Sequence, residues 1–377
     1  MSGLYFHIPF CRSKCPYCDF YSVVAAGHDL DRYVQALCLD LEQSRDWYGS
    51  APFSTVFFGG GTPSLLSGEQ IATLLQCATH HYGLRDDVEV SMEVNPGTVD
   101  VAALESYRRA GVNRLSIGVQ SLDGHQLRWL QRAHSAQQAV DVVHAARRAG
   151  FSRINVDLMF ALPGQSDESL RQTCRRLAEL SPEHVAVYGL TVEEGTPLAS
   201  AEQHGDWQPV DDETYCRHFQ LVSEELTSLG YEHYEISNFA RPGEACRHNL
   251  GYWQRQPYLG IGAGAHSFRA CGWGERWACP DDVCRYMVLA EEGTSTRQCI
   301  ETFNHDQAIS EAAYLALRCC QGVDLDLFRQ RYGVDFCEYF AEGIRACGHD
   351  LSHNGNRCSF NLQGWLLYNS HIENFLL

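Results

Sequence analysis

The sequence has little positive charge and no long apolar run. Its 377 residues include 29 lysines and arginines against 47 aspartates and glutamates, which gives a formal net charge of −18. Nucleic acids and anionic membrane surfaces are bound mainly through Lys and Arg, so this balance argues against both as partners. No apolar stretch is long enough to cross a bilayer, and Met1 leads almost directly into a strand-like run, which leaves no room for a signal peptide. We therefore expect a cytoplasmic protein without a transmembrane segment.

Cysteine, in contrast, is abundant. The chain has 17 cysteines, and a cysteine-rich sequence without a leader fits a reducing cytosol, where thiols stay free. The hydrophobic fraction of 45% is that of an ordinary globular protein. The length accommodates two domains, or one large α/β domain with an appendage. Several cysteines lie in amphipathic segments and are predicted to be small buried hydrophobic residues: Cys38, Cys77, Cys174, Cys319 and Cys320.

Three cysteines near the N-terminus are set apart by their spacing. Cys11, Cys15 and Cys18, the cysteine triad, form a C-x3-C-x2-C pattern. Iron–sulfur clusters are normally held by four cysteines, so three thiolates can hold three irons of a [4Fe–4S] cube and leave the fourth iron open to an outside ligand. A structural zinc site favours four ligands with C-x2-C pairs, and a disulfide framework suits small secreted chains. Chance spacing among the many cysteines is the remaining alternative.

The triad resembles the signature of the radical S-adenosylmethionine (SAM) superfamily. Tyr17, directly before the third cysteine, is also usual in that superfamily. There the open iron binds the amino and carboxylate groups of SAM, and the reduced cluster cleaves SAM to a 5′-deoxyadenosyl radical. The resemblance therefore implies a [4Fe–4S] cluster and SAM as cofactors.

Strand-like and helix-like segments alternate over the first two-thirds of the chain. The strand-like runs, nearly continuous in Val, Ile, Leu and Phe, lie at 4–8, 55–58, 88–93, 114–119, 154–159 and 184–189. The helical patterns between them lie at 31–44, 68–81, 100–110, 136–149 and 167–180, and another helix is predicted at 213–229. Asp100 and Asp167 suit helix N-caps, and Gly111 and Gly150 suit the position after a helix end.

Six β-α units in series predict a parallel sheet with right-handed crossovers and helices on its faces. A closed eight-unit barrel would need two more units. We therefore expect the α/β fold of the radical SAM superfamily, a partial (β/α)6 TIM-like barrel, followed by a small, mostly helical C-terminal domain.

Polar residues stand where several of these strands end, which is where chemistry gathers in such folds. Glu93 ends the third strand, Gln120 ends the fourth, and Asp157 lies within the fifth. Each could serve a structural hydrogen bond, but three on successive strands favour one polar site in the barrel mouth. The glycine-rich run 59–63 follows the second strand and is either a plain turn or a backbone surface for SAM. Arg132 is either a surface charge or a partner of the SAM carboxylate.

A wider resemblance covers nearly the whole chain. The run 5–11 (Y-F-H-I-P-F-C), the segments 157–164 and 234–238, and the C-terminal part resemble the oxygen-independent coproporphyrinogen III oxidase family of radical SAM proteins. The resemblance implies that the cysteine triad holds the [4Fe–4S] cluster. It also implies a SAM site formed by Tyr5, Tyr17, Gly60, Gly61, Thr62, Glu93, Gln120, Arg132 and Asp157.

One departure separates two branches of that family. The dehydrogenases carry another cysteine two residues after the third cluster cysteine, whereas this chain has Phe20 there. They also have a longer N-terminal arm, while Tyr5 is almost at the start of this sequence. Both differences match the HemW-type haem chaperones, relatives that are often mislabelled as coproporphyrinogen oxidases.

A second motif points to the same branch. The run 248–253 reads H-N-L-G-Y-W and resembles the H-N-x-x-Y-W segment tied to haem binding in those chaperones. A neutral imidazole is a common axial ligand to haem iron, so His248 is a candidate ligand, with Asn249 beside it. Tyr252 and Trp253 could supply flat apolar surface for a porphyrin. The alternative is that the two aromatic residues are interdomain core and that His248 caps a loop.

The rest of the chain carries weaker signals. The glycine-rich run 260–267 lacks the features of a nucleotide loop and is predicted either to close over the barrel mouth or to pack tightly. Residues 271–297 show no clear period and are predicted to be a connector. The expected domains are a radical SAM core at 1–240, a haem-motif segment and connector at 241–300, and a winged-helix-like domain at 301–377 with helices at 310–317 and 325–332.

Three functions remain open from the sequence. The first is a haem chaperone that carries a SAM-binding cluster, binds haem and passes it to acceptor haemoproteins, respiratory ones among them, and that forms a homodimer. The second is an oxygen-independent coproporphyrinogen III dehydrogenase, in which the radical abstracts hydrogen from propionate side chains. The third is another radical SAM reaction. Phe20 favours the first over the second.

Overall fold

A computed structural model describes residues 2–49 and 51–376. Its core is a run of six parallel strands that are neighbours in the order of the chain. These strands are β1 (Gly3–Ile8), β4 (Phe53–Gly60), β5 (Leu84–Val94), β6 (Arg114–Gln120), β7 (Arg153–Phe160) and β8 (His184–Gly189). The helices that follow them are α1 (Leu30–Gln43), α3 (Gly68–His81), α4 (Val101–Ala110), α6 (Ala136–Arg148), α7 (Asp167–Glu179) and α9 (Asp212–Ser228). The partial (β/α)6 barrel predicted from the sequence is confirmed.

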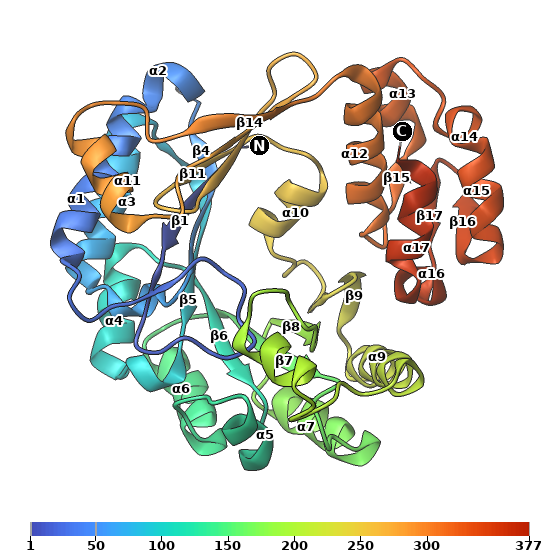
Figure 1. Cartoon of the computed structure of the whole chain (residues 1–377), viewed down its shortest axis with the longest axis horizontal. Coiled ribbons are helices and arrows are strands. Elements are labelled where there is room, and N and C mark those ends of the chain that lie inside the picture. Colours follow the sequence, from blue (N-terminus) through green and yellow to red (C-terminus); the bar gives the residue numbers. More distant parts are fainter. Residues whose placement is uncertain (1, 50, 377) are drawn as a thin grey trace.

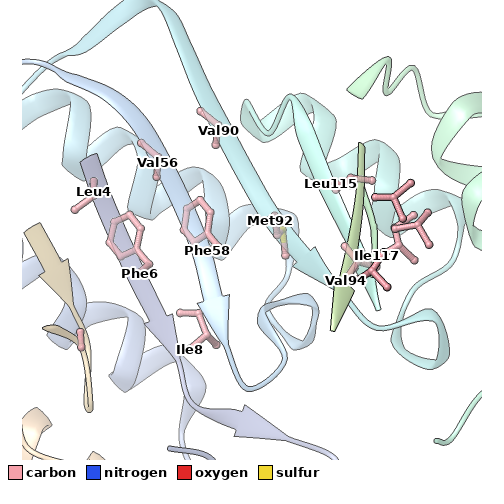
Figure 2. Packing of buried hydrophobic residues seen from close by; sticks show 14 of the residues in the cluster. Leu4, Phe6, Ile8, Val56, Phe58, Val90, Met92, Val94, Leu115 and Ile117 are labelled. Atoms are coloured by element: carbon pink, nitrogen blue, oxygen red, sulfur yellow. The ribbon is translucent and has the colours of Figure 1, made fainter. Parts of the chain in front are cut away.

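The strands face two environments. Alternate side chains of β1 and β4, such as Leu4, Phe6 and Phe58, are fully buried against the surrounding helices, as Figure 2 shows for neighbouring strands. Successive strand residues point to opposite faces, so the residues between these apolar ones point into the barrel. Tyr5 and His7 are such residues of β1. The apolar face stabilises the sheet, and the inner face is left for polar side chains.

Most helix ends match the sequence signals. Asp100 caps α4, where its carboxylate accepts a hydrogen bond from the Ala103 backbone N–H, and α4 ends at Gly111 in the left-handed region. The N-cap predicted at Asp167 is wrong. Ser166 caps α7 instead, because its short hydroxyl reaches the Ser169 N–H at 3.2 Å. Asp167, inside the first turn, is free to pair with an arginine of α9.

The sheet continues past both ends of the six-stranded core. Its order is β14-β13-β12-β11-β1-β4-β5-β6-β7-β8-β10-β9, so it remains open rather than closing into a ring. β9 (Glu232–Glu235) and β10 (Asn238–Ala240) extend it beside β8. On the other side β11 (Tyr258–Ile261) pairs in parallel with β1, followed by β12 (His266–Arg269), β13 (Glu275–Ala278) and β14 (Gln298–Thr302).

The segment predicted to be a connector is therefore structured. Residues 271–297 contain β13 and α11 (Val283–Glu291), which packs on α1. A buried ion pair joins Arg297 to Asp40 of α1, and Thr296 and Tyr286 also donate to the Asp40 carboxylate. Edge strands of four residues are too short to give a readable period, which is why the pattern was missed. The glycine-rich run before β12 packs tightly: a Cβ on Gly262 would lie 2.5 Å from the His7 carbonyl oxygen.

The C-terminal part is a compact unit of helices and one small sheet, set apart from the barrel strands in Figure 1. Its long helix, α12 (His305–Leu317), carries Glu311, which pairs in the interior with Arg255 and Arg276. The other elements are β15 (Val323–Asp324), α13 (Leu325–Tyr332), α14 (Phe336–Tyr339), α15 (Ala341–Cys347), β16 (Leu351–Asn354), β17 (Arg357–Phe360), α16 (Leu362–Leu366) and α17 (Tyr368–Ile372). None of the helices in the described ranges is long and apolar enough to cross a membrane.

The cysteines predicted to be buried divide into three groups. Cys174 and Cys319 are buried, and Cys38 and Cys77 are partly buried. Cys320 is exposed, which corrects the prediction, because it lies in the turn after α12 rather than on the apolar face of that helix.

Candidate functional site

A cavity of about 460 Å³ occupies the inside of the open barrel. The loop that carries the cysteine triad lines one part of it. Another part is lined by α10 (Arg247–Trp253), which Figure 1 places between the barrel strands and the C-terminal unit. The strands between them contribute inward-pointing polar residues.

Strand register brings these polar residues into one layer. Glu93 of β5 lies beside Ser116 of β6, Ser116 beside Asn155 of β7, and Asn155 beside His184 of β8. Asp157 lies two residues further along β7, on the same face. Because parallel strands end at the same edge, residues far apart in the sequence meet in this cavity. The polar side chains that were predicted to meet in the barrel mouth therefore lie together there.

The two carboxyl groups of this ring are strongly perturbed. Burial, together with the negative charge of Asp157, raises the pKa of Glu93 to about 8. Burial also raises the pKa of Asp157 to about 6, while hydrogen bonds from Asn155 and Ser116 and the charge of Arg132 oppose that rise. Two acids held at different pKa values in one cavity are typical of a ligand site.

The cysteine triad lies at the carboxyl ends of the strands. The Thr62 hydroxyl donates to the Cys11 sulfur at 3.5 Å, and the Arg132 guanidinium donates to the Cys15 sulfur at 3.5 Å. Within the described ranges, no three His, Cys, Asp or Glu side chains converge as a single metal ion would require. A [4Fe–4S] cube instead takes each cysteine on a separate iron, so the three thiols need not converge. Positive and hydroxyl donors beside these sulfurs fit a thiolate-bound cluster.

A glycine cradle lies next to the triad. Gly60 has a φ of 114°, and a Cβ there would lie 2.7 Å from the His7 ring. A Cβ on Gly61 would lie 2.8 Å from the Phe10 carbonyl oxygen and 3.0 Å from the Cys11 sulfur. Only glycine fits these two positions, so the backbone lines the cavity directly. The Gly60 N–H donates to Glu93 at 3.2 Å.

All nine residues predicted for SAM line this cavity: Tyr5, Tyr17, Gly60, Gly61, Thr62, Glu93, Gln120, Arg132 and Asp157. Gln120 has a φ of 64°, an unusual backbone for a residue with a side chain. Arg132 is held by the Gly118 carbonyl at 3.1 Å and by Cys15, but its buried Nε has no hydrogen-bond partner among the residues that the structure describes. A buried donor of this kind in the cavity, with Asp157 near enough to feel its charge, suits a ligand with its own acceptor groups.

The four residues predicted for haem are divided. His248, Asn249 and Tyr252 line the cavity, but Trp253 is not among the lining residues and packs under the Arg318 guanidinium instead. His248 is only 3% exposed, and both ring nitrogens have partners: Thr55 at 2.8 Å and Tyr252 at 2.9 Å. Burial lowers its pKa to about 3, so the ring is neutral. The structure places His248 as a packed wall residue, with neither nitrogen free.

Sequence reasoning missed a second set of inward residues. Arg114, Ser116, Asn155, His184 and Tyr188 all line the cavity. The signal was available, because these residues alternate with apolar ones along three parallel strands, and a parallel sheet covered on both faces normally lacks such alternation. Reading each strand as simply apolar concealed it.

The comparisons with known proteins agree with this geometry. A family model described as the radical SAM superfamily matches residues 5–177, and one described as the HemN C-terminal domain matches residues 303–367. A relative from Mycobacterium tuberculosis with the name "Heme chaperone HemW" is 35% identical over 377 residues, which cover 99% of this chain and 94% of the relative. The chain belongs to the HemW family of radical SAM proteins.

Two further relatives and one solved structure support this assignment. A HemW relative from Escherichia coli is 44% identical over 267 residues, 70% of this chain and 69% of the relative. "Radical S-adenosyl methionine domain-containing protein 1, mitochondrial" from Danio rerio is 36% identical and covers all of this chain and 87% of that protein. Among solved structures, coproporphyrinogen III oxidase (HemN) from Escherichia coli superposes with a TM-score of 0.85 at 25% identity, covering 99% of this chain and 89% of that one. The family and the fold class expected from the sequence are confirmed.

Proposed function

We propose that this protein is a haem chaperone that binds haem and delivers it to acceptor haemoproteins. The observation that carries the proposal is the full-length match to relatives named "Heme chaperone HemW" in several bacteria. Phe20 supports it, since the dehydrogenases are expected to carry a cysteine there. Phe20 is 63% exposed and lines the cavity beside the triad loop. A phenyl ring cannot supply the thiol of that cysteine.

The proposal includes a [4Fe–4S] cluster and SAM. Cys11, Cys15 and Cys18 would hold the cluster, and the nine cavity residues predicted for SAM would hold SAM. When bound and reduced, the cluster supplies the electron that cleaves SAM in this superfamily. The chain's own contribution is positional: the glycine cradle admits the ligand, Arg132 offers a positive charge, and Glu93 and Asp157 offer acceptors.

For haem, we propose the segment 248–253, with its arrangement in this structure as the resting state. His248, Asn249, Tyr252 and Trp253 would contact haem, but His248 can reach an iron only if its bonds to Thr55 and Tyr252 open. Such opening breaks two neutral hydrogen bonds, about 1 kcal/mol each, which haem ligation can offset. We further propose a cytoplasmic location, homodimer formation and respiratory acceptors.

The second candidate is an oxygen-independent coproporphyrinogen III oxidase. The close superposition on HemN favours this second candidate, because the two proteins share the barrel and the C-terminal unit. Under this alternative the cavity would hold a porphyrinogen and not serve haem transfer.

Haem titration of anaerobically reconstituted protein tests the first proposal. We expect saturable uptake of one haem per chain with a Soret band distinct from free haem. His248→Ala should weaken uptake or shift the band, while His125→Ala, an exposed histidine on another helix, should not. Unchanged uptake in His248→Ala would remove the axial ligand from this segment. No saturable uptake by the wild type would overturn the chaperone proposal itself.

A further inference from the structure

A continuous chain of hydrogen bonds runs through the barrel from α10 to Asp157. The backbone N–H of Cys246, the N-cap of α10, donates to the Tyr234 hydroxyl at 3.4 Å. Tyr234 contacts His184 Nε2 at 2.7 Å, and His184 Nδ1 contacts the Asn155 carbonyl oxygen at 2.7 Å. The Asn155 amide nitrogen contacts Asp157 at 2.6 Å.

The direction of each bond follows from its neighbour. An ionised carboxylate only accepts, so the Asn155 NH₂ must face Asp157, and its oxygen must face His184. His184 Nδ1 then carries the proton and donates to that oxygen. In a neutral ring Nε2 accepts, so the Tyr234 hydroxyl donates to it. Every donor in the chain therefore points toward Asp157.

His184 is held neutral by its surroundings. Burial lowers its pKa well below the usual value, and the nearby Arg114 guanidinium acts in the same direction. Ser116 adds a second donor, since the Asn155 amide binds its hydroxyl at 2.7 Å while that hydroxyl donates to Asp157 at 3.2 Å. With the carboxylate ionised, this orientation of the Asn155 amide lets both Ser116 and Asp157 accept from its nitrogen.

We infer that His184 and Tyr234 are positioning residues that lock the Asn155 amide in the one orientation that donates to Asp157. Without this lock the amide can rotate and turn its oxygen toward the carboxylate, which disfavours the ionised form. Only the expected effect on SAM binding rests on the proposed function. The lock itself is a property of this chain without any ligand.

Other groups near Asp157 act independently of the chain. Glu93 and Tyr188 lie close enough to interact electrostatically with Asp157, and Arg132 favours its ionised form. None of these groups is hydrogen-bonded to His184 or Tyr234 in the described part of the chain. A change confined to the chain should therefore move the Asp157 titration while leaving its charged neighbours in place.

The test reads the Asp157 carboxyl group directly by infrared titration of its protonated C=O band, assigned by its loss in Asp157→Asn. In the reconstituted wild type we expect a midpoint near 6. Tyr234→Phe and His184→Leu should each move it upward by at least about half a pH unit. His184→Asn should restore it, because an asparagine N–H can replace Nδ1–H as the donor to Asn155.

Tyr231→Phe is the matched control. Tyr231 is also buried, but its hydroxyl donates to the Pro182 carbonyl at 2.8 Å, outside the chain. We expect its midpoint to equal that of the wild type. An unchanged midpoint in both Tyr234→Phe and His184→Leu, or an equal shift in Tyr231→Phe, would overturn the inference.

Calorimetric SAM titration at about pH 5.5, just below the Asp157 midpoint, separates this inference from the proposed site. If Asp157 must be ionised to hold SAM, the upward shift in Tyr234→Phe should weaken binding at this pH by about twofold or more. An infrared shift without weaker binding would leave the lock intact and remove Asp157 from the SAM site. Failure of the inference about the hydrogen-bond chain and failure of the proposed SAM site therefore give different results.

Discussion

Replacing Glu93 with glutamine should stabilise the fold at high pH and weaken SAM binding. Burial and the charge of Asp157 raise the Glu93 pKa from 4.5 to about 8. Between these values the folded protein keeps a proton that the unfolded chain releases. By linkage, this group lowers the free energy of unfolding as the pH rises from 4.5 to about 8. Glutamine, which cannot ionise, removes that effect.

The magnitude follows from the size of the pKa change. One pH unit corresponds to about 1.4 kcal/mol. A rise from 4.5 to about 8 therefore sets an upper limit of roughly 5 kcal/mol. Glu93 borders the cavity, where water lowers the penalty of charge, so we expect a gain of about 2 kcal/mol at about pH 8.5. The gain should vanish below about pH 4, under the unfolded pKa of 4.5, where glutamate is mostly protonated in both states.

Urea unfolding of anaerobically reconstituted protein at the two pH values measures this difference. Glu179→Gln, an exposed position on α7, is the control and should change stability by less than about 0.5 kcal/mol at either pH. SAM affinity of Glu93→Gln at about pH 8.5, where the wild-type carboxyl group is mostly ionised, should fall about fivefold or more, since a hydrogen bond to a charged group is worth about 1–3 kcal/mol. If the glutamine variant is no more stable than the wild type at high pH, the conclusion that Glu93 keeps its proton in the folded protein is wrong.

Two further predictions concern the cluster and the structured segment after α10. Alanine at any position of the cysteine triad should abolish the broad visible absorption and the bound iron and sulfide of reconstituted protein. Cys38→Ala should retain both. A triad variant with full iron content would contradict the cluster assignment. Asp40→Ala should lower the free energy of unfolding by about 3–5 kcal/mol, because Arg297 remains buried without its counter-charge. Glu291→Ala, which breaks an exposed pair, should cost about 1 kcal/mol or less, and equal losses in the two variants would contradict the buried role of Asp40.

Much of the barrel could be predicted from the sequence because its signals are local. Strand-like runs rich in apolar residues predicted β5 and β7, and amphipathic patterns predicted α3 and α6, within a few residues of their observed ends. The strand ends also located Glu93 and Asp157, since parallel strands finish at one edge. The N-cap of α7 could not be predicted from residue type, because both Ser166 and Asp167 suit an N-cap. The structure shows that Ser166 is the residue whose side chain accepts the hydrogen bond.

The rest depended on contacts between distant segments. The strands after α10 have no period of their own. β11 pairs with β1, β12 to β14 continue the sheet from it, and Asp40 holds Arg297 just before β14. The environment of His248 could not be predicted from its motif alone, because one partner of its ring, Thr55, comes from β4. The sequence predicts His184 only as the start of an apolar strand, and its hydrogen bonds depend on how β7, β8 and β9 are arranged.

The central claim is that this chain transfers haem and does not decarboxylate coproporphyrinogen III. The most direct measurement gives one preparation of reconstituted protein both tasks anaerobically. One sample receives SAM, a reductant and coproporphyrinogen III, with products followed by chromatography; the other is loaded with haem and mixed with an apo-haemoprotein. The account predicts no decarboxylated tetrapyrrole and stoichiometric transfer of haem to the acceptor. Decarboxylated product at enzymatic rates, with no haem transfer, would contradict it.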